Sequence, residues 1–504
     1  MTTRTVIFGL YIAWDFTNYV AESARLISAS GEMSYVPPGD GFSSGRGIIS
    51  SMNLTLRNDD ARYSALNEDS AIYAYIQNGK AYHAPCYLTV SVDGGLTNPR
   101  IFTGVIKWPE IIGATATTGS RAQIECRSNE EKLLQTRMST TLEDFAGYHD
   151  TGYDEGSLIT AWLTDAGISG GSMEIDTGLL NIPWAWLDDE SPIEEIWKLS
   201  AACGGRFYAN PDGKFVYESA TYWLTNSESL AIQESLDESN YTLLEPVYDD
   251  RDLFDSVLVE AAPREALSPD YLWTPDEIVR VLPGETKVIT ARLRQPAYEI
   301  DDVTFTARTA GGTNITASVD VSAVNYAQRV VVTITNNHAT HTAYMRPLSI
   351  TGRTVSGSIT VEEERNADDH GTNGAYFTTR GSRRKSIRGN VYIQSRAHAA
   401  MIADMLMRQA ETPRLSFRLS GCPGEPTRRL GQRITVLDTS TMSSYRTTLI
   451  AKVKWRLNDN GFSQDLECID LSTLYPYLDA SPGYFVVGTS ELGSIDPQRG
   501  RVFF

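Results

Sequence analysis

The sequence predicts a mainly β protein with a small α/β part, on three observations. Alternating or β-branched segments, separated by turns rich in Gly, Asn and Asp, occur along most of the 504 residues. Helical patterns are few, and two of the three lie within residues 150–205. A pattern near the front of the chain recurs near its end, which indicates a small β-barrel made twice.

The composition is that of an acidic globular protein. The formal net charge of -19 argues against a general nucleic-acid binder, because such proteins carry a basic surface. The cysteines are scattered, odd in number and without a CxxC pair, so we expect neither a disulfide framework nor a zinc knuckle and infer folding in a reducing cytosol. They are Cys86, Cys126, Cys203, Cys422 and Cys468. No segment approaches the roughly 18 apolar residues that span a bilayer, so no membrane span is expected.

The first strands are predicted near the N-terminus. VIFGLYIAW, residues 6–14, is short and apolar with charged residues on both sides, which favours a β-strand over a signal peptide. SSMNLTLRNDDARYS, residues 50–64, alternates apolar and polar side chains and then reaches Asp59 and Asp60. We predict a turn there, because Asn-Asp-Asp supplies turn chemistry and no further ligands for a metal or catalytic site stand nearby.

Three helices are predicted. Residues 157–167 carry apolar side chains at helical spacing and end at a glycine. In SPIEEIWKLSAACGG, Ser191 is the expected N-cap, Glu194 completes a capping box and Gly204 ends the helix. A hairpin, GRFYANPDGKFVY, follows this helix, so the region forms a small α/β unit. The third helix, 395–413, ends at a proline.

The second half of the chain begins with an all-β segment. Residues 250–363 show a two-faced sheet pattern, which predicts a sandwich. Residues 365–390 then change from acidic to basic and contain Gly, Asn and Ser, which predicts a loop or boundary. The cations of this loop are candidate contacts with another subunit or ring; contact with DNA and a merely solvated loop are the alternatives. They are Arg380, Arg383, Arg384, Lys385 and Arg388.

The repeat relates the two ends of the chain. YLTVSVDGGLTNPRIFTGVIKW followed by SRAQIEC resembles RITVLDTSTMSSYRTTLIAKVKW followed by SQDLEC, and the upstream strands NLTLRN and SFRLSG extend the match. Coincidence between two hairpins is the alternative, but Lys-Trp followed by Glu-Cys in the same order favours duplication. We expect Trp and Cys to pack inward and the adjacent Lys and Glu to face outward. The predicted repeat core is Val90, Trp108, Cys126, Val436, Trp455 and Cys468.

A duplicated barrel has a consequence for assembly. Three such chains around a threefold axis present six similar barrels in a ring. A homotrimer can therefore sit on a sixfold partner.

Several segments in order resemble the hub, or tail-tip, proteins of tailed bacteriophages and related injection machines. MNLTLRNDDARYS, APCYLTVSV and RIFTGVIKWPE are similar to the first tube-type domain of such hubs. LITAWLTDAGI with IEEIWKLSAACGGRFYANPDGKFVYES is similar to their α/β domain. VLPGETKVITARLRQP with VVVTITNNHATHTAYMRPLSITGRTVS resembles their β-sandwich, and VYIQSRAHAAMIADMLMRQAETPRLSFRLSG with RRLGQRITVLD their second tube-type domain. The resemblance covers about residues 30–475 and keeps the domain order.

The resemblance implies a division of the chain and a fold: two related tube-type β-barrel domains, an α/β domain and a β-sandwich domain. The expected domains are a first tube-type barrel (1–141), an α/β domain (142–248), a β-sandwich (249–365), a second tube-type barrel with one helix (366–475) and a C-terminal extension (476–504). The extension matches nothing in the family.

The function implied by the resemblance is mechanical. Hubs of this family are homotrimers that close the tail tube. They bind the distal tail ring above and the tip, spike or fibre below, meet the C-terminus of the tape-measure protein, and let genomic DNA pass without sequence-specific binding. The expected place is the tail tip of the virion, after assembly in the host cytoplasm. A negative charge suits this passage, because a basic lumen would hold DNA by its phosphates.

We expect no enzyme activity, no catalytic residue, no metal and no cofactor. GISGG around Ser169 matches a nucleophile motif, but a helix precedes it and a strand follows, the reverse of the order such an elbow needs. RLNDNGFSQDLE, residues 456–467, mimics half of an EF-hand but begins with Arg456, which calcium cannot use, so a hairpin turn is favoured. His338 and His341 stand in a polar loop between strands.

Two alternatives remain open at this stage. One is a carbohydrate-binding or carbohydrate-active β-protein of the virion, such as an adhesin or glycosidase, in which exposed tryptophans stack on sugars. The candidates for stacking are Trp184, Trp186, Trp223 and Trp273. The other is the hub of a contractile tail or secretion-type injector; no inserted lysozyme-like domain is evident, which favours a long flexible tail.

Overall fold

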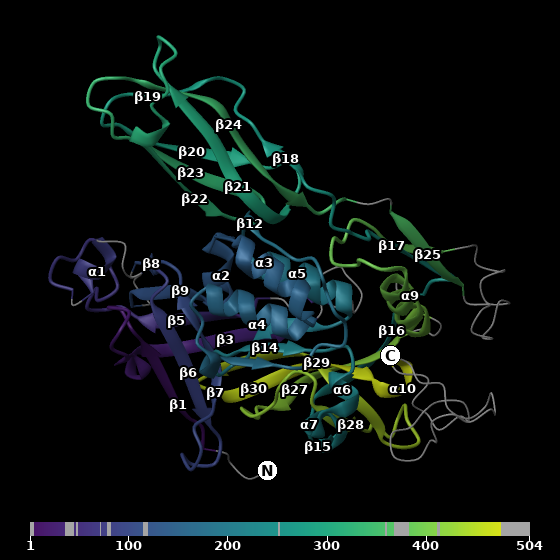
Figure 1. The fold of residues 1–504 in the computed structure, drawn as a ribbon. Coiled ribbons are helices and arrows are strands. Elements are labelled where there is room, and N and C mark those ends of the chain that lie inside the picture. The colour runs from purple at the N-terminus through teal and green to yellow at the C-terminus, as the bar shows by residue number, and fades with distance from the viewer. Residues whose placement is uncertain are drawn as a thin grey trace.

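The computed structural model confirms a mainly β fold with a small α part (Figure 1). It describes residues 5–35, 45–46, 49–70, 72–77, 82–113, 119–249, 253–357, 360–366, 383–410 and 414–474. The predicted extension 476–504 lies outside these residues.

A 14-stranded sheet contains both the first and the last of the described strands. Its N-terminal part, which we call the first β unit, also holds the short helices η1 (Ser23–Arg25) and α1 (Tyr73–Gln77). The strands of the first β unit are β1 (Ile7–Ile12), β2 (Val20–Ala21), β3 (Leu26–Ser34), β5 (Ser51–Arg57), β6 (Pro85–Ser91), β7 (Arg100–Ile106), β8 (Glu110–Ile112) and β9 (Arg121–Ser128). The predicted first strand within residues 6–14 is confirmed as β1.

The C-terminal strands form the second β unit of the same sheet. They are β15 (Ile232–Leu236), β16 (Leu243–Asp249), β27 (Arg414–Pro423), β28 (Arg433–Val436), β29 (Arg446–Asn458) and β30 (Gly461–Asp470), followed by α10 (Leu471–Leu474). β15 and β16 come from the segment expected in the α/β domain, yet they pair with β28 and β27. The unit is therefore completed by strands from the middle of the chain.

The sheet forms because its strands have the two-residue alternation that buries one face. In β5, Met52, Leu54 and Leu56 are buried, whereas Asn53 and Thr55 face outward. The same alternation holds in β30. The buried faces enclose one apolar core in each β unit.

The two units do not close into separate barrels. The strand order runs β16-β27-β30-β29-β3-β5-β9-β7-β6-β1-β2, so β3 pairs with a strand of each unit. No closed barrel is formed by the pairings of the described strands. The structure differs from the predicted pair of closed barrels because β29 pairs with the edge of β3 that closure of the first barrel would need.

The middle of the chain forms the α/β part. Its four main helices are α2 (Glu130–Gln135), α3 (Leu142–Thr151), α4 (Glu155–Asp165) and α5 (Pro192–Cys203). A small sheet of order β11-β14-β13-β4 packs with them. The remaining elements are β4 (Gly45–Arg46), β10 (Met138–Ser139), η2 (Gly170–Ser172), β11 (Met173–Ile175), β12 (Asp188–Glu190), β13 (Arg206–Ala209), β14 (Phe215–Glu218), α6 (Tyr222–Thr225) and α7 (Ser227–Leu230).

Helix α5 begins and ends as predicted but is not capped as predicted. Gly204 ends it with a left-handed φ of 72°, a conformation that costs glycine little. Ser191 makes no side-chain cap, because its buried Oγ donates instead to the carbonyl of Leu133 at 3.1 Å. The predicted capping box is therefore wrong, and the serine ties α5 to the end of α2.

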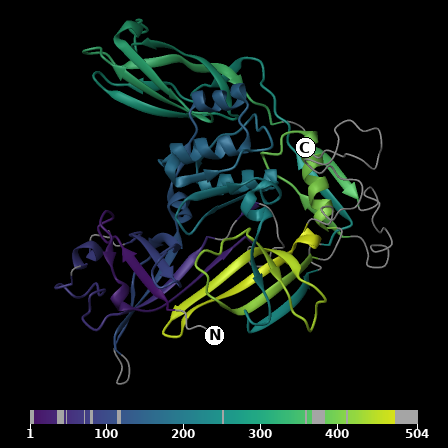
Figure 2. The ribbon, with the colours of Figure 1, turned by 90° about the horizontal axis from the view of Figure 1, so that it is seen from below.

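The sandwich consists of two sheets around a separate core. Its elements are β18 (Asp270–Trp273), β19 (Val279–Val281), β20 (Thr286–Arg292), β21 (Ala297–Arg308), η3 (Thr316–Ser318), β22 (Val319–Asn325), β23 (Arg329–Asn336) and β24 (Ala343–Thr354). It projects from the α/β part on the side away from the 14-stranded sheet (Figures 1 and 2).

A fourth element group lies beside the α/β part (Figure 2). It contains a three-stranded sheet of order β25-β17-β26 and the predicted third helix. Its elements are β17 (Ser256–Ala261), β25 (Val361–Asn366), β26 (Arg384–Ile387) and α9 (Arg396–Ala410). The prediction of a loop throughout 365–390 is wrong at its basic end, where β26 pairs in parallel with β17.

Candidate functional site

The two β units share an order of four antiparallel strands. The order is β6-β7-β9-β5 in the first unit and β28-β29-β30-β27 in the second. Cys126 of β9 lies opposite Ile106 of β7, and Cys468 of β30 lies opposite Ile450 of β29. A buried cysteine at the same place in the same strand order supports an internal duplication.

The tryptophans of the predicted repeat do not correspond. Trp108 is 41% exposed, whereas Trp455 is 2% exposed. β7 ends at Ile106, and Pro109 has no N–H with which to continue the ladder, so the chain leaves the sheet at Trp108. Strand β29 continues unbroken through Trp455. The prediction that Trp108 packs inward is therefore wrong.

The remaining predicted core residues are placed inside the sheet. The buried ones are Val90, Cys126, Val436, Trp455 and Cys468. The residues expected to face outward are all at least partly exposed; they are Lys107, Glu125, Lys454 and Glu467. Their alternation with the buried residues follows from the period of a β-strand.

Strand β3 joins the units through one tight contact and one charged cluster. Gly31 lies opposite Trp455 in the ladder, and the indole covers the glycine. On the outer face, the carboxylate of Glu32 lies 2.5 Å from Lys452 Nζ and 3.4 Å from Lys454 Nζ. The two faces of the join are thus held by packing and by charge.

The α/β part is tied to the sheet at a buried carboxylate, Glu218. Tyr35 Oη, Tyr208 Oη and Trp223 Nε1 donate to it at 2.8, 2.9 and 2.9 Å. The guanidinium of Arg206 lies over the Trp223 ring, 3.7 Å from its centroid. Burial raises the pKa of Glu218. Because Tyr35 follows β3 and Tyr208 lies in β13, this carboxylate links the join to the α/β part.

The Pro-Asp-Gly hairpin of the α/β part also contacts the first β unit. Thr103 Oγ1 donates to the Pro211 carbonyl and Asn129 Nδ2 to the Gly213 carbonyl, both at 2.7 Å. Gly213 has a φ of 85°, and a Cβ there would lie 2.6 Å from Thr103 Cγ2. The glycine is required by both the turn and the close approach.

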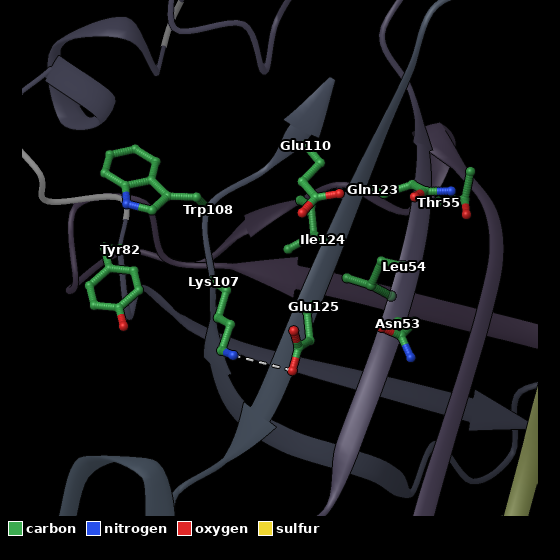
Figure 3. A pocket seen from close by; sticks show the side chains of 10 residues that line it. All are labelled: Asn53, Leu54, Thr55, Tyr82, Lys107, Trp108, Glu110, Gln123, Ile124 and Glu125. Carbon is green, nitrogen blue, oxygen red and sulfur yellow. Dashed lines mark ion pairs between the residues drawn. The ribbon is translucent and has the colours of Figure 1, made fainter. Parts of the chain in front are cut away.

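The break in the sheet at Trp108 opens a hollow of about 660 Å³, which we call the aromatic groove. Its wall on one side is Trp108 and Tyr82, whose ring planes are 19° apart with centroids at 6.4 Å. Lys107 Nζ and Glu125, 3.4 Å apart, lie in its middle (Figure 3). The other polar lining residues are Asn53, Thr55, Glu110 and Gln123.

Of the basic segment predicted as a subunit contact, Arg384 and Lys385 lie in strand β26, and Arg383 and Arg388 flank it. Arg384 and Arg388 pair with Glu364 and Glu362 of β25 at 3.2 and 3.0 Å. The ammonium of Lys385 lies over the ring of Phe254, whose centroid it approaches to 5.4 Å. Arg383 also has contacts within the chain, and Arg380 lies outside the described residues. The subunit contact stays a prediction, made by a strand rather than a loop.

The acidic pair Asp59–Asp60 is confirmed as a turn. The buried Asn58 closes it, since its Oδ1 accepts from the Tyr63 backbone N–H at 2.9 Å. Asp60 pairs with Arg25 through two bonds of 2.6 and 2.8 Å. The bond to this guanidinium lowers the pKa of Asp60, so the residue holds the turn in place.

The rejected motifs occupy structural positions. Helix α4 ends before Ser169 and strand β11 follows it, which confirms the reversed order. Residues 456–467 form the β29–β30 hairpin, in which Asn460 N donates to Asn458 Oδ1 at 2.9 Å. The ring of His338 accepts backbone N–H bonds from Thr340 and His341, so it caps its own loop.

The four tryptophans considered for sugar stacking do not form a groove. Trp184 and Trp223 are buried, and Trp186 and Trp273 are half-buried against apolar clusters. Their burial removes the feature on which the sugar-binding alternative depended. Trp108, by contrast, is exposed, although the repeat predicts it in the core.

Neither a metal-binding cluster nor a membrane-spanning helix occurs in the described part of the chain. No group of three or more His, Cys, Asp or Glu side chains that could hold a metal ion occurs among them. None of the helices in this part of the chain has the length and apolar character of a membrane span.

No protein-family model and no curated protein matches the sequence, but solved structures do. A tail protein from Neisseria meningitidis MC58 aligns with 8% identity and a TM-score of 0.49 over 93% of this chain and 98% of that one. The 43 kDa tail protein of prophage MuSo2 from Shewanella oneidensis aligns with 11% identity and a TM-score of 0.46, over 93% of this chain and 100% of that one. The E. coli c3393 protein aligns with 9% identity and a TM-score of 0.36, over 90% of this chain and 75% of that one. It is a type VI secretion component described as structurally similar to the T4 tail proteins gp27 and gp5.

Proposed function

We propose that the chain is the structural hub of a bacteriophage tail tip. The observation that carries this proposal is the pair of β units with one strand order and one cysteine position, joined edge to edge through β3. Two similar units in each chain give a trimer six similar faces, which suits a threefold object that meets a sixfold ring.

The continuous sheet supports a structural role. The 14-stranded sheet is continuous across both units, and the Glu218 cluster and the Pro-Asp-Gly hairpin fix the α/β part on it. A rigid protein of this kind holds its binding partners at fixed positions relative to one another. In the proposed hub, the partners are the distal tail ring, the C-terminus of the tape-measure protein and the tip, spike or fibre, and genomic DNA passes along the axis.

The proposal is tested by the mass and symmetry of the purified protein. Light scattering should give three times the chain mass of 55.7 kDa, and electron microscopy should show a ring with threefold symmetry and a central hole. Addition of the distal tail protein of the same phage should give a stacked complex. A stable monomer that forms no ring with that protein would contradict the proposal.

A further inference from the structure

We propose that the aromatic groove of the first β unit binds a neutral saccharide. The groove is separate from the β3 join and from the Glu218 cluster on which the proposed function depends. Its volume of about 660 Å³ falls in the range of roughly 300–1,000 Å³ that small-molecule sites occupy.

The aromatic wall supplies a surface on which a sugar ring can stack. Trp108 is 41% exposed, and Tyr82 lies nearly parallel to it at 6.4 Å. Figure 3 shows both rings on one side of the groove, with the polar side chains across from them. A pyranose ring has an apolar face of C–H groups and a rim of hydroxyls, so it matches an aromatic surface that faces polar side chains.

The opposite wall supplies hydrogen-bonding groups suited to hydroxyls. Asn53, Thr55 and Gln123 face outward from β5 and β9. Each amide side chain carries an N–H donor and a C=O acceptor side by side, so it can hydrogen-bond to two neighbouring sugar hydroxyls. The carboxylates of Glu110 and Glu125 add acceptors for hydroxyl protons.

The charge of the groove selects a neutral ligand. Two carboxylates line it against one ammonium, that of Lys107. Lys107 is paired with Glu125, and Arg127, from outside the lining, pairs with Glu125 at 2.9 Å and with Glu131 at 3.5 Å. The uncompensated charge is therefore the negative one of Glu110, which repels sialylated, sulfated or phosphorylated sugars.

The groove exists because the first β unit departs from the second. The chain leaves β7 before Pro109 and returns to the sheet as β8, which opens the hollow beside Trp108. In the second unit, β29 is 13 residues long and pairs with β30 from Thr448 to Asn458, so the strand continues at the corresponding edge. The aromatic groove is therefore a feature of the first β unit that the second does not share, as expected if only one copy binds the ligand.

The test uses the full chain and defined sugars. Saturation-transfer NMR should detect binding of at least one of maltotriose, cellotriose, chitotriose and β1–4-galactotriose at millimolar concentration, and calorimetry should give its Kd. We expect W108A to weaken that binding by about tenfold or more, and Q123A to weaken it less. Sialyllactose should bind more weakly than the neutral sugar.

The matched control is Y271A, which removes another exposed aromatic, 70% exposed in the sandwich, and should leave saccharide binding unchanged. Circular dichroism of W108A establishes that the fold is retained. The proposal is overturned if none of the four sugars binds, if W108A binds as well as the parent, or if sialyllactose binds best. It is also overturned if W108A disrupts the oligomer and has no effect on sugars, because the groove would then be a protein contact. Saccharide binding does not require a trimer, so its outcome is independent of the proposed hub function.

Discussion

Gly31 and Trp455 face each other where the two β units meet, and the indole fills the space that a side chain on Gly31 would need. An ideal Cβ on Gly31 would lie 2.3 Å from Trp455 Cζ2 and 2.8 Å from the Ser51 carbonyl oxygen. Neither neighbour is free to move far, since Trp455 is 2% exposed and Ser51 belongs to the paired strand β5. The edge of β3 therefore accepts β29 only if the residue at this position has no side chain.

The first prediction concerns this contact. We expect G31A to lower the free energy of unfolding by about 1–3 kcal/mol, as overpacking in a filled core does. Urea denaturation followed by fluorescence measures the change. G147A is the matched control, because a Cβ at this helical glycine of α3 meets nothing within 4 Å, and it should raise stability by up to about 1 kcal/mol. Equal effects of the two variants would contradict the tight join.

The second prediction concerns the buried carboxylate of Glu218. E218A removes the buried carboxylate to which Tyr35, Tyr208 and Trp223 donate, so we expect the free energy of unfolding to fall by about 3–5 kcal/mol. Thermal and urea unfolding measure it. E174A, which removes a carboxylate paired with Lys214 at the surface, should have no measurable effect. If E218A unfolds like the parent, the cluster does not hold the α/β part on the sheet.

The fold class and most elements were predictable because local patterns decide them. Alternation marked β5, the repeat marked β30, and helical spacing with a closing glycine or proline marked α4, α5 and α9. Helix α3 was missed although its signals are present, with Thr141 as N-cap and Gly152 in the left-handed conformation. The pairing of β3 with β29 was not predictable, since an edge of a strand has no local signature of its distant partner.

The third prediction concerns pH. Glu130 is 1% exposed and accepts from the Ala209 backbone N–H at 2.6 Å; burial raises its pKa from an ordinary 4.5 to about 7. A carboxyl whose pKa is raised on folding stabilises the fold while protonated, so this stability is complete below pH 4.5 and is lost as the pH rises to 7. The loss is about 3 kcal/mol.

We expect the free energy of unfolding of E130Q to fall less between pH 5 and pH 8 than that of the parent, because the amide does not ionise. Denaturation at a series of pH values in one buffer system measures the two slopes. Parallel curves for the parent and E130Q would show that Glu130 does not titrate in this window.

The fourth prediction concerns two arginines, one in strand β26 and one directly after it. Arg384 and Arg388 are exposed and paired with Glu364 and Glu362, so R384A/R388A should cost at most about 1 kcal/mol of stability. Sedimentation of the same variant then tests the proposed subunit contact. A weakened oligomer with an intact fold supports that contact, and an unchanged oligomer removes it. K287A, in the sandwich, is the control for loss of surface charge.

The candidate site was harder to predict than the fold. Lys-Trp before Glu-Cys in both copies suggested that Trp108 and Trp455 are equivalent, but one signal against this was present. Pro109 directly follows Trp108, and a proline cannot donate to a ladder, so the strand had to end there. The glutamates buried at positions 130 and 218 had no sequence signal, because Ala209 and Tyr35, which donate to them, lie 79 and 183 residues away in the sequence.

The pairing of β3 with β29 also determines when the protein can finish folding. Residues 26–34 leave the ribosome long before residues 446–458 have been translated, so one edge of β3 waits in the nascent chain with its N–H and C=O groups unpaired. Such long-range pairing is slow and leaves the intermediate prone to association. Chains that end before β29 therefore keep an unpaired strand edge that can associate with other chains. Synthesis of β29 allows this edge to pair and so lowers the risk of aggregation.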